Sequence, residues 1–357
     1  MKRVDWIDLK MKIKNSQKRF ELFNNRLEYF KYFKDSFLYS FKSDPLANFM
    51  ILRLRFSPLK GMVMAFLLTI FVYFTGYILL LITKYPVVGI TQTYLDFFYD
   101  IIVIPIVFAS YLWMSTAPSY TLFRIGQVQE KIEDEMEFSV IISDLFKKLN
   151  NKLIFLFGLG AALFLGFNCL FCVSGKFGSF IGGRLNINFF YYIKIPVLWF
   201  VSWYVVAVIV VKVFVFVTAL RKILDKIVLD TDESSIHDLK ILKPVKDFLK
   251  TLTYFFGACG YGLIMIVVRG NYYGYFNHKW VIYTGVILYV FIISFIFFSP
   301  LHPFFHLLKR AGRKVFDNKG ILKIQIPFKI LPFDLLRNFL LSCCIPPLFI
   351  LVFIISS

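Results

Sequence analysis

Long apolar runs alternate with basic, polar segments along the whole chain. The runs cover residues 61–83, 101–123, 153–173, 195–220, 251–268, 281–301 and 338–355. Apart from Lys212 in the fourth run, none of the seven contains Asp, Glu, Lys or Arg. About 20 consecutive apolar residues form an α-helix that crosses the hydrocarbon core of a bilayer. The pattern therefore predicts an all-α, polytopic membrane helix bundle with about seven transmembrane helices.

The composition changes how the runs are interpreted. The 357 residues are 58% hydrophobic and 18% charged, whereas about a quarter of the residues of a soluble domain are charged. Buried helices of a large soluble protein are therefore the less favoured explanation. The first run begins only at residue 61, after a basic segment, which is not the layout of a cleaved leader. We expect this first helix to stay in the mature protein.

Lysine and arginine gather on one side of the predicted membrane. Of the 41 basic residues, 34 fall in residues 1–60, 124–152, 221–250 and 304–337, and 6 fall in the other connections and flanks. Basic loops resist translocation, so the richer side is expected to be cytoplasmic. We expect a multi-pass protein of the cell membrane, with its N-terminus in the cytoplasm and its C-terminus outside.

The net charge of +19 follows the same membrane flanks. Membrane topology and attraction to anionic lipid head groups explain it, so the lipid bilayer is the expected partner. A basic surface can also bind a nucleic-acid backbone, but the distribution of the charge does not require a nucleic-acid partner. A homo-oligomer assembled around a pore is a further partner arrangement that the sequence allows.

Two kinds of domain follow from the pattern. Residues 1–58 form a basic cytoplasmic region, and residues 59–357 form the transmembrane bundle with cytoplasmic connections at 124–152, 221–250 and 304–337. The N-terminal region carries an apolar stripe at helical spacing, made of Phe20, Phe23, Leu27, Phe30, Phe33, Phe37 and Phe41. Such a stripe lies in the lipid interface or packs on other cytoplasmic helices.

The connection 124–152 is expected to continue the second membrane helix into the cytoplasm. It contains an acidic stretch, EKIEDEME, at residues 130–137. The acidic side chains pair with the basic N-terminal region or lie on a solvated helix face, and the second alternative is slightly favoured.

Lys212 is the most informative single residue of the sequence, because a charged side chain inside a membrane helix costs free energy and tends to have a function. Its long side chain reaches back toward the interface, or it faces a water-filled path. Asn168, an amide in the third run, is the second candidate for lining a transport path. No Asp or Glu lies inside any run, so a relay of carboxylates for protons is not expected.

Two further patterns contain residue types that bind metal ions. His302 and His306 are four residues apart, but Pro303 lies between them and no Glu is near, so a zinc site of the His-Glu-x-x-His type is not expected. We expect both histidines near the lipid head groups, with pH sensing as the alternative. Cys169 and Cys172 lack a second ligand pair. No metal or cofactor is predicted.

Small residues at helical spacing predict close packing between helices. Gly158, Ala162 and Gly166 repeat at every fourth position of the third run. Such ridges let neighbouring helix backbones approach each other. Prolines at 105, 118 and 196 lie in the second and fourth runs, and broken membrane helices can mark binding positions.

The chain contains no phosphate-binding loop and no dinucleotide fingerprint, so we do not expect an enzyme. Most of its mass is predicted membrane bundle. The leading hypothesis is a channel or transporter for a small ion or solute. The alternative hypothesis is a membrane-anchored sensor or scaffold whose cytoplasmic helices bind a partner.

Overall fold

The structure is a computed structural model. It describes residues 41, 43–83, 90–128, 131–132, 135–174, 195–228, 242–272 and 279–299, together with isolated positions between 337 and 352. Most of the described residues are helical, short turns and connections join the helices, and one antiparallel pair of two-residue strands is present among them, β1 (Lys131–Ile132) and β2 (Ile227–Val228). The predicted all-helical fold class is thereby confirmed.

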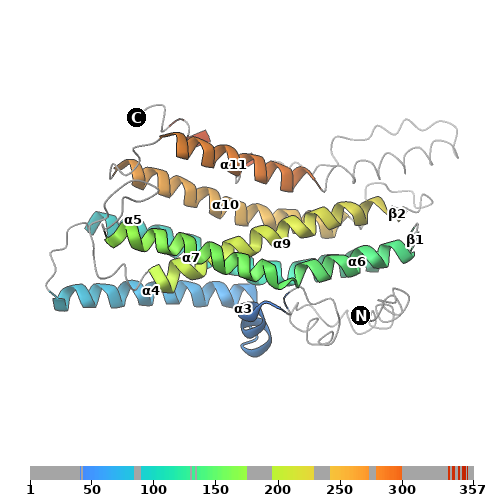
Figure 1. Cartoon of the computed structure of the whole chain (residues 1–357), viewed down its shortest axis with the longest axis horizontal. Coiled ribbons are helices and arrows are strands. Elements are labelled where there is room, and N and C mark those ends of the chain that lie inside the picture. The colour runs from blue at the N-terminus through green and yellow to red at the C-terminus, as the bar shows by residue number, and fades with distance from the viewer. Residues whose placement is uncertain are drawn as a thin grey trace.

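The helices lie side by side along the long axis of the molecule, with β1 and β2 at one end (Figure 1). The long helices are α4 (Pro58–Thr83), α5 (Ile90–Val128), α6 (Glu135–Leu149), α7 (Lys152–Ser174), α9 (Phe200–Asp225), α10 (Leu242–Tyr272) and α11 (Lys279–Phe298). The short elements are α3 (Pro45–Asn48) and two π-helical turns, η1 (Phe49–Arg53) and η2 (Ile195–Trp199).

Six of the seven apolar runs coincide with these helices. Most of the seventh, 338–355, lies outside the described residues. Within the described part of the chain, three helices are long and apolar enough to cross a membrane: Pro58–Ile78, Asp100–Leu122 and Val197–Asp225. These helices are compatible with a membrane location, whereas the count of seven spans is not confirmed.

Helix α5 is the central element of the bundle because it packs against α4, α9 and α10. It continues through Pro105 and Pro118 without a break, so the prolines of the second run do not divide this helix. The connection after it differs from the predicted continuous helix. α5 ends at Val128, β1 pairs with β2, and α6 begins at Glu135.

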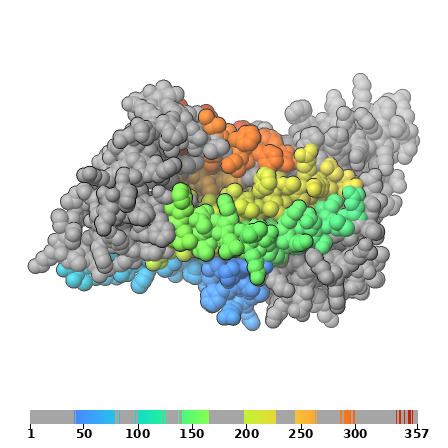
Figure 2. All heavy atoms as spheres, viewed as in Figure 1, coloured from blue at the N-terminus to red at the C-terminus, as the bar shows by residue number. Residues whose placement is uncertain are grey.

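The surface of the bundle changes character along its length. Large apolar side chains are exposed on α4, α7 and α11, among them Phe71, Phe74, Phe157, Phe164 and Phe291. On α6, by contrast, Glu137, Asp144, Lys147 and Lys148 are exposed. Figures 1 and 2 show α6 and α7 end to end beside α9. The apolar-surfaced part and the polar-surfaced part therefore meet at residues 150–151, where α6 ends and α7 begins.

The predicted close packing on the third run is found between α7 and α9. A Cβ atom at Gly158 would lie 2.7 Å from Cγ2 of Val208 and 3.3 Å from the ring of Tyr204. Ala162, one turn further, is buried. The small residues of α7 thus let α9 approach closely, as the ridge of small residues indicated.

The acidic stretch of the connection 124–152 has a partner on α9. Glu137 forms an ion pair with Lys226, with a distance of 2.6 Å between Oε2 and Nζ. Both side chains are partly exposed, so the pair stabilises the docking of α6 only modestly. The stripe of Phe20 to Phe37 in the N-terminal region lies outside the described residues.

Candidate functional site

A carboxylate from the N-terminal region lies inside the helix bundle. Asp44 precedes α3 in an extended conformation, and its Oδ1 accepts a hydrogen bond from the backbone N–H of Ala47 at 3.2 Å. Asp is a preferred residue at the N-cap position, and Pro45 follows it where proline is favoured. α3 projects from the side of the bundle near its middle (Figure 1). The local sequence thus fixes the turn that directs Asp44 at α5 and α9.

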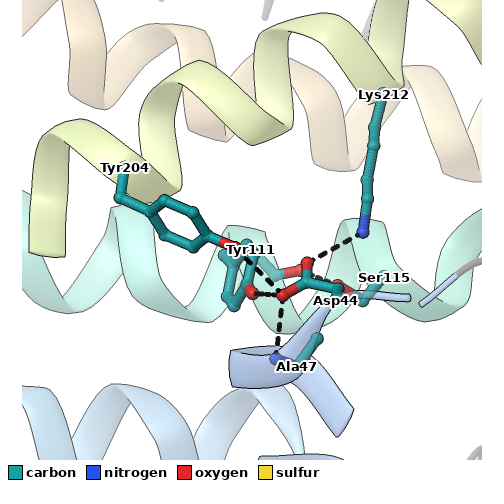
Figure 3. A network of polar contacts seen from close by, with 6 residues as sticks. All are labelled: Asp44, Ala47, Tyr111, Ser115, Tyr204 and Lys212. Atoms are coloured by element: carbon teal, nitrogen blue, oxygen red, sulfur yellow. Dashed lines mark hydrogen bonds and ion pairs between the residues drawn. The ribbon is translucent and has the colours of Figure 1, made fainter. Parts of the chain in front are cut away.

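Three side chains of the long helices meet the carboxylate of Asp44 (Figure 3). Lys212 Nζ of α9 lies 3.2 Å from Oδ2. The Tyr111 hydroxyl of α5 donates to Oδ1 at 2.6 Å, and the Tyr204 hydroxyl of α9 donates to the same oxygen at 3.3 Å. We call Asp44, Tyr111, Tyr204 and Lys212 the Asp44 cluster.

The two charged side chains are removed from the surface. The side chain of Lys212 is 1% exposed and that of Asp44 is 0% exposed. Lys212 Nζ also faces the rings of Phe155 at 5.3 Å and Tyr111 at 6.0 Å. A buried charge is strongly destabilising unless it is paired and hydrogen-bonded. The Asp44 cluster meets that condition, since its opposite charges are in contact and phenol hydroxyls bond the carboxylate.

Lys212 is paired with Asp44 inside the bundle, a contact that the sequence did not predict. Its ammonium is buried inside the bundle beside the Asp44 carboxylate, and a position near the membrane interface stays a prediction. A path at Lys212 stays a prediction, and in the described arrangement the Asp44 carboxylate and the aromatic rings cover the ammonium.

A second buried carboxylate lies nearer to the N-terminal end of α5 than Tyr111. Asp100 is 0% exposed. Its Oδ2 accepts a hydrogen bond from the Tyr73 hydroxyl of α4 at 2.6 Å, and its Oδ1 accepts one from Trp199 Nε1 of η2 at 3.3 Å. Asp100 and Tyr111 are eleven positions apart in α5, which is about 16 Å along the axis.

A small cavity of ≈ 30 Å³ lies between α4, α5 and α9. Its lining on α5 is Ile104, Val107 and Phe108, which fall between Asp100 and Tyr111 in the helix. The remaining lining is almost entirely apolar, and the hydroxyl of Ser202 is bonded to the carbonyl of Leu198 at 2.6 Å. The cavity has room for about one water molecule. It places open space between the two carboxylate sites.

Hydroxyl groups of α5 mostly bond their own helix. Ser110 donates to the carbonyl of Ile106 at 2.7 Å, and Ser115 donates to that of Tyr111 at 2.9 Å. Such back-bonding uses the donor that a solute would otherwise meet. Among the residues that the structure describes, the buried charged side chains are Asp44, Asp100 and Lys212.

Of the candidate residues of the sequence, the structure describes the side chain of Lys212. Lys212 lies in the Asp44 cluster. Asn168 belongs to α7, but the environment of its side chain lies outside the described residues, and so do His302 and His306. Sequence reasoning missed Asp44, Tyr111, Tyr204 and Asp100. The available signal was the Asp44–Pro45 helix start, which gives no indication of a partner.

Within the described residues, no group of three or more His, Cys, Asp or Glu side chains is placed to hold a metal ion. The Asp44 cluster instead combines one ammonium and two phenol hydroxyls around a single carboxylate. That arrangement stabilises one negative charge, because hydrogen bonds to an ionised group are stronger than those between neutral groups.

Comparison of the chain with protein-family models, with curated proteins and with solved structures finds no match.

Proposed function

We propose that this protein passes a small ion or solute across a membrane and that the described arrangement is its closed state. The observation that carries the proposal is that two buried carboxylate sites follow one another along α5, with a small and mostly apolar cavity between them. Asp100 contacts α4 and η2, the cavity lies beside the next turns of α5, and the Asp44 cluster joins α5 to α9. Burying an ionisable side chain inside a membrane bundle costs free energy, and such residues usually line the pathway of an ion or solute.

The two surface types support a placement in the bilayer. In the proposed arrangement, lipid surrounds the apolar-surfaced part with α4, α7 and α11. The polar-surfaced part with α6 extends into the cytoplasm, on the side that the basic segments favour. Phe155, which faces Lys212, is only three residues after the start of α7 at Lys152. The Asp44 cluster then lies near the cytoplasmic boundary of the membrane and controls entry to the path.

Closure follows from the packing around Lys212. The ammonium contacts the Asp44 carboxylate on one side and faces aromatic rings on others. Opening the path requires the segment that carries Asp44 to move away from α5 and α9, because these helices contribute the other members of the cluster.

Reconstitution in liposomes tests the proposal. Wild-type protein is expected to release trapped ions or small solutes under an imposed gradient. Lys212→Met is expected to change the rate or the preference between anions and cations. Lys222→Met is the matched control, because Lys222 lies on the same helix but is exposed. Absence of flux for wild type and both variants, under gradients of either charge sign, would contradict the proposal.

The polar-surfaced part supports the sensor or scaffold as a second candidate. Val140 is 60% exposed on α6, and the other side chains of α6 that the structure describes as exposed are charged. A partner that binds α6 would cover it. This function predicts that Val140→Asp weakens binding of a cytoplasmic protein, measured by quantitative co-purification, and leaves the thermal stability of the purified protein unchanged. Equal recovery of the partner with both proteins would argue against it.

A further inference from the structure

We propose that Lys212, Tyr111 and Tyr204 form a binding site for a small monovalent carboxylate, and that Asp44 occupies this site as an internal, tethered equivalent. The inference rests on the proposed function and names the class of solute. The donors belong to the long helices α5 and α9. The carboxylate that they bind belongs to a different part of the chain, the segment before α4.

The bonding pattern matches a single carboxylate. One oxygen of Asp44 accepts from two phenol hydroxyls, at 2.6 Å from Tyr111 and 3.3 Å from Tyr204. The other oxygen lies 3.2 Å from Lys212 Nζ. The fourth contact, from the N–H of Ala47, comes from the segment that carries Asp44. When that segment withdraws, the site that remains on α5 and α9 retains one ammonium and two hydroxyl donors.

The charge balance selects the anion class. Lys212 supplies one positive charge, and Asp44 is its one acidic partner among the described residues. A cation would meet an unfavourable ammonium, and a divalent anion would leave one negative charge uncompensated in a buried site. The ring of Phe155 lies 5.3 Å from Nζ and limits the size of the occupant. A small carboxylate with one charge therefore fits best.

The segment that carries Asp44 is joined to α4 through an energetically unfavourable backbone conformation. Between η1 and α4 the chain passes through Arg55, whose φ of 54° is the one positive value among the described non-glycine residues. A side chain with a Cβ is disfavoured in this left-handed conformation. The docked segment thus holds its own connection in a strained state. Because Lys212 would be left buried without an anion, withdrawal of Asp44 and entry of a free carboxylate are coupled.

Replacement of the tethered carboxylate by a free one tests the inference. In Asp44→Ala, the methyl group of alanine plus formate reproduces the atoms of the aspartate side chain. Formate is expected to raise the unfolding temperature of purified Asp44→Ala by about 3 °C or more, since a ligand that binds only the folded state stabilises it. Wild type, whose site is occupied by Asp44, is expected to shift much less. Sulfate at the same ionic strength is the control and is expected not to distinguish the two proteins.

The double variant Asp44→Ala/Lys212→Met identifies the site, because the shift with formate must disappear with the ammonium. Equal shifts in wild type, the single variant and the double variant would overturn the inference, and so would no shift in Asp44→Ala. If Asp44→Ala does not fold, Asp44→Asn replaces it. Formate is then expected to stabilise Asp44→Asn more than wild type, and an equal or absent effect would overturn the inference.

Formate uptake by liposomes separates this inference from the proposed function. A formate-dependent shift without any flux would overturn the transport function and retain the carboxylate site. Flux of other ions without a formate-dependent shift would overturn the carboxylate site and retain transport. Both a shift and saturable formate uptake are the expected results.

Discussion

Asp44 and Lys212 are 168 positions apart in the chain, and their charged atoms lie 3.2 Å apart in the interior of the bundle. The contact joins the segment before α4 to the middle of α9. It has two consequences that differ in kind. It neutralises a lysine that would otherwise be buried alone, and it anchors the segment before α3 to α9.

Removing one member of this pair is expected to be far more harmful than removing both. Lys212→Met and Asp44→Asn should each lower the free energy of unfolding by about 3–5 kcal/mol, because each leaves one partner of a buried pair uncompensated. The double variant should be less destabilised than the sum of the two. Unfolding of the purified protein in mixed detergent and denaturant measures all four states. Additive effects would show that the two side chains do not interact energetically.

The two tyrosines of the Asp44 cluster are expected to differ. The Tyr111 hydroxyl is 2.6 Å from Oδ1, whereas the Tyr204 hydroxyl is 3.3 Å away. A hydrogen bond to a charged group contributes about 1.5–3 kcal/mol. Tyr111→Phe should therefore lose a value in that range and Tyr204→Phe clearly less. The same unfolding assay ranks the two variants, and a larger loss for Tyr204→Phe would contradict the geometry.

Two glycines of α7 form a matched pair for the packing between α7 and α9. The added Cβ of Gly158→Ala would lie 2.7 Å from Val208 Cγ2, whereas nothing lies within 4 Å of the corresponding position at Gly160. Overpacking at Gly158 should cost about 1–3 kcal/mol. Gly160→Ala should raise the helix stability by roughly 0.5–1 kcal/mol. Thermal unfolding of both variants should show shifts of opposite sign, and equal shifts would place the close contact elsewhere.

The strained connection at Arg55 gives a prediction that concerns the docked segment. Arg55→Gly removes the unfavourable left-handed Cβ, a relief of about 1 kcal/mol before the extra freedom of glycine in the unfolded chain is subtracted. The docked conformation should become more stable. Limited proteolysis between residues 44 and 57 should be slower than in wild type.

Arg53→Gly is the control for that experiment, because Arg53 closes η1 with ordinary backbone angles. Glycine should loosen this turn, so proteolysis of the same segment should be faster. Faster cleavage of Arg55→Gly would mean that the left-handed residue does not strain the docked segment.

The apolar runs by themselves determined where α4, α5, α7, α9, α10 and α11 form. A charge-free run of this length is most stable as a helix when it is removed from water, because every interior backbone N–H and C=O group is then hydrogen-bonded within the segment. Lys212 was also visible in the sequence, because a charge inside an apolar run stands out without any knowledge of its neighbours. The small residues around Gly158 also indicated a close contact between helices, because the periodicity of a single helix fixes which residues share a face.

The tertiary structure alone decided what Lys212 meets. Asp44 lies in a polar segment outside every apolar run, and its approach to Lys212 depends on a turn at α3, a strained connection at Arg55 and the crossing of α5 and α9. None of these is encoded in the periodicity of one segment. Periodicity reports the face that a helix buries, whereas a contact between residues 44 and 212 depends on how three separate segments are placed in space. The same limit applies to Asp100, whose partners Tyr73 and Trp199 come from two other elements.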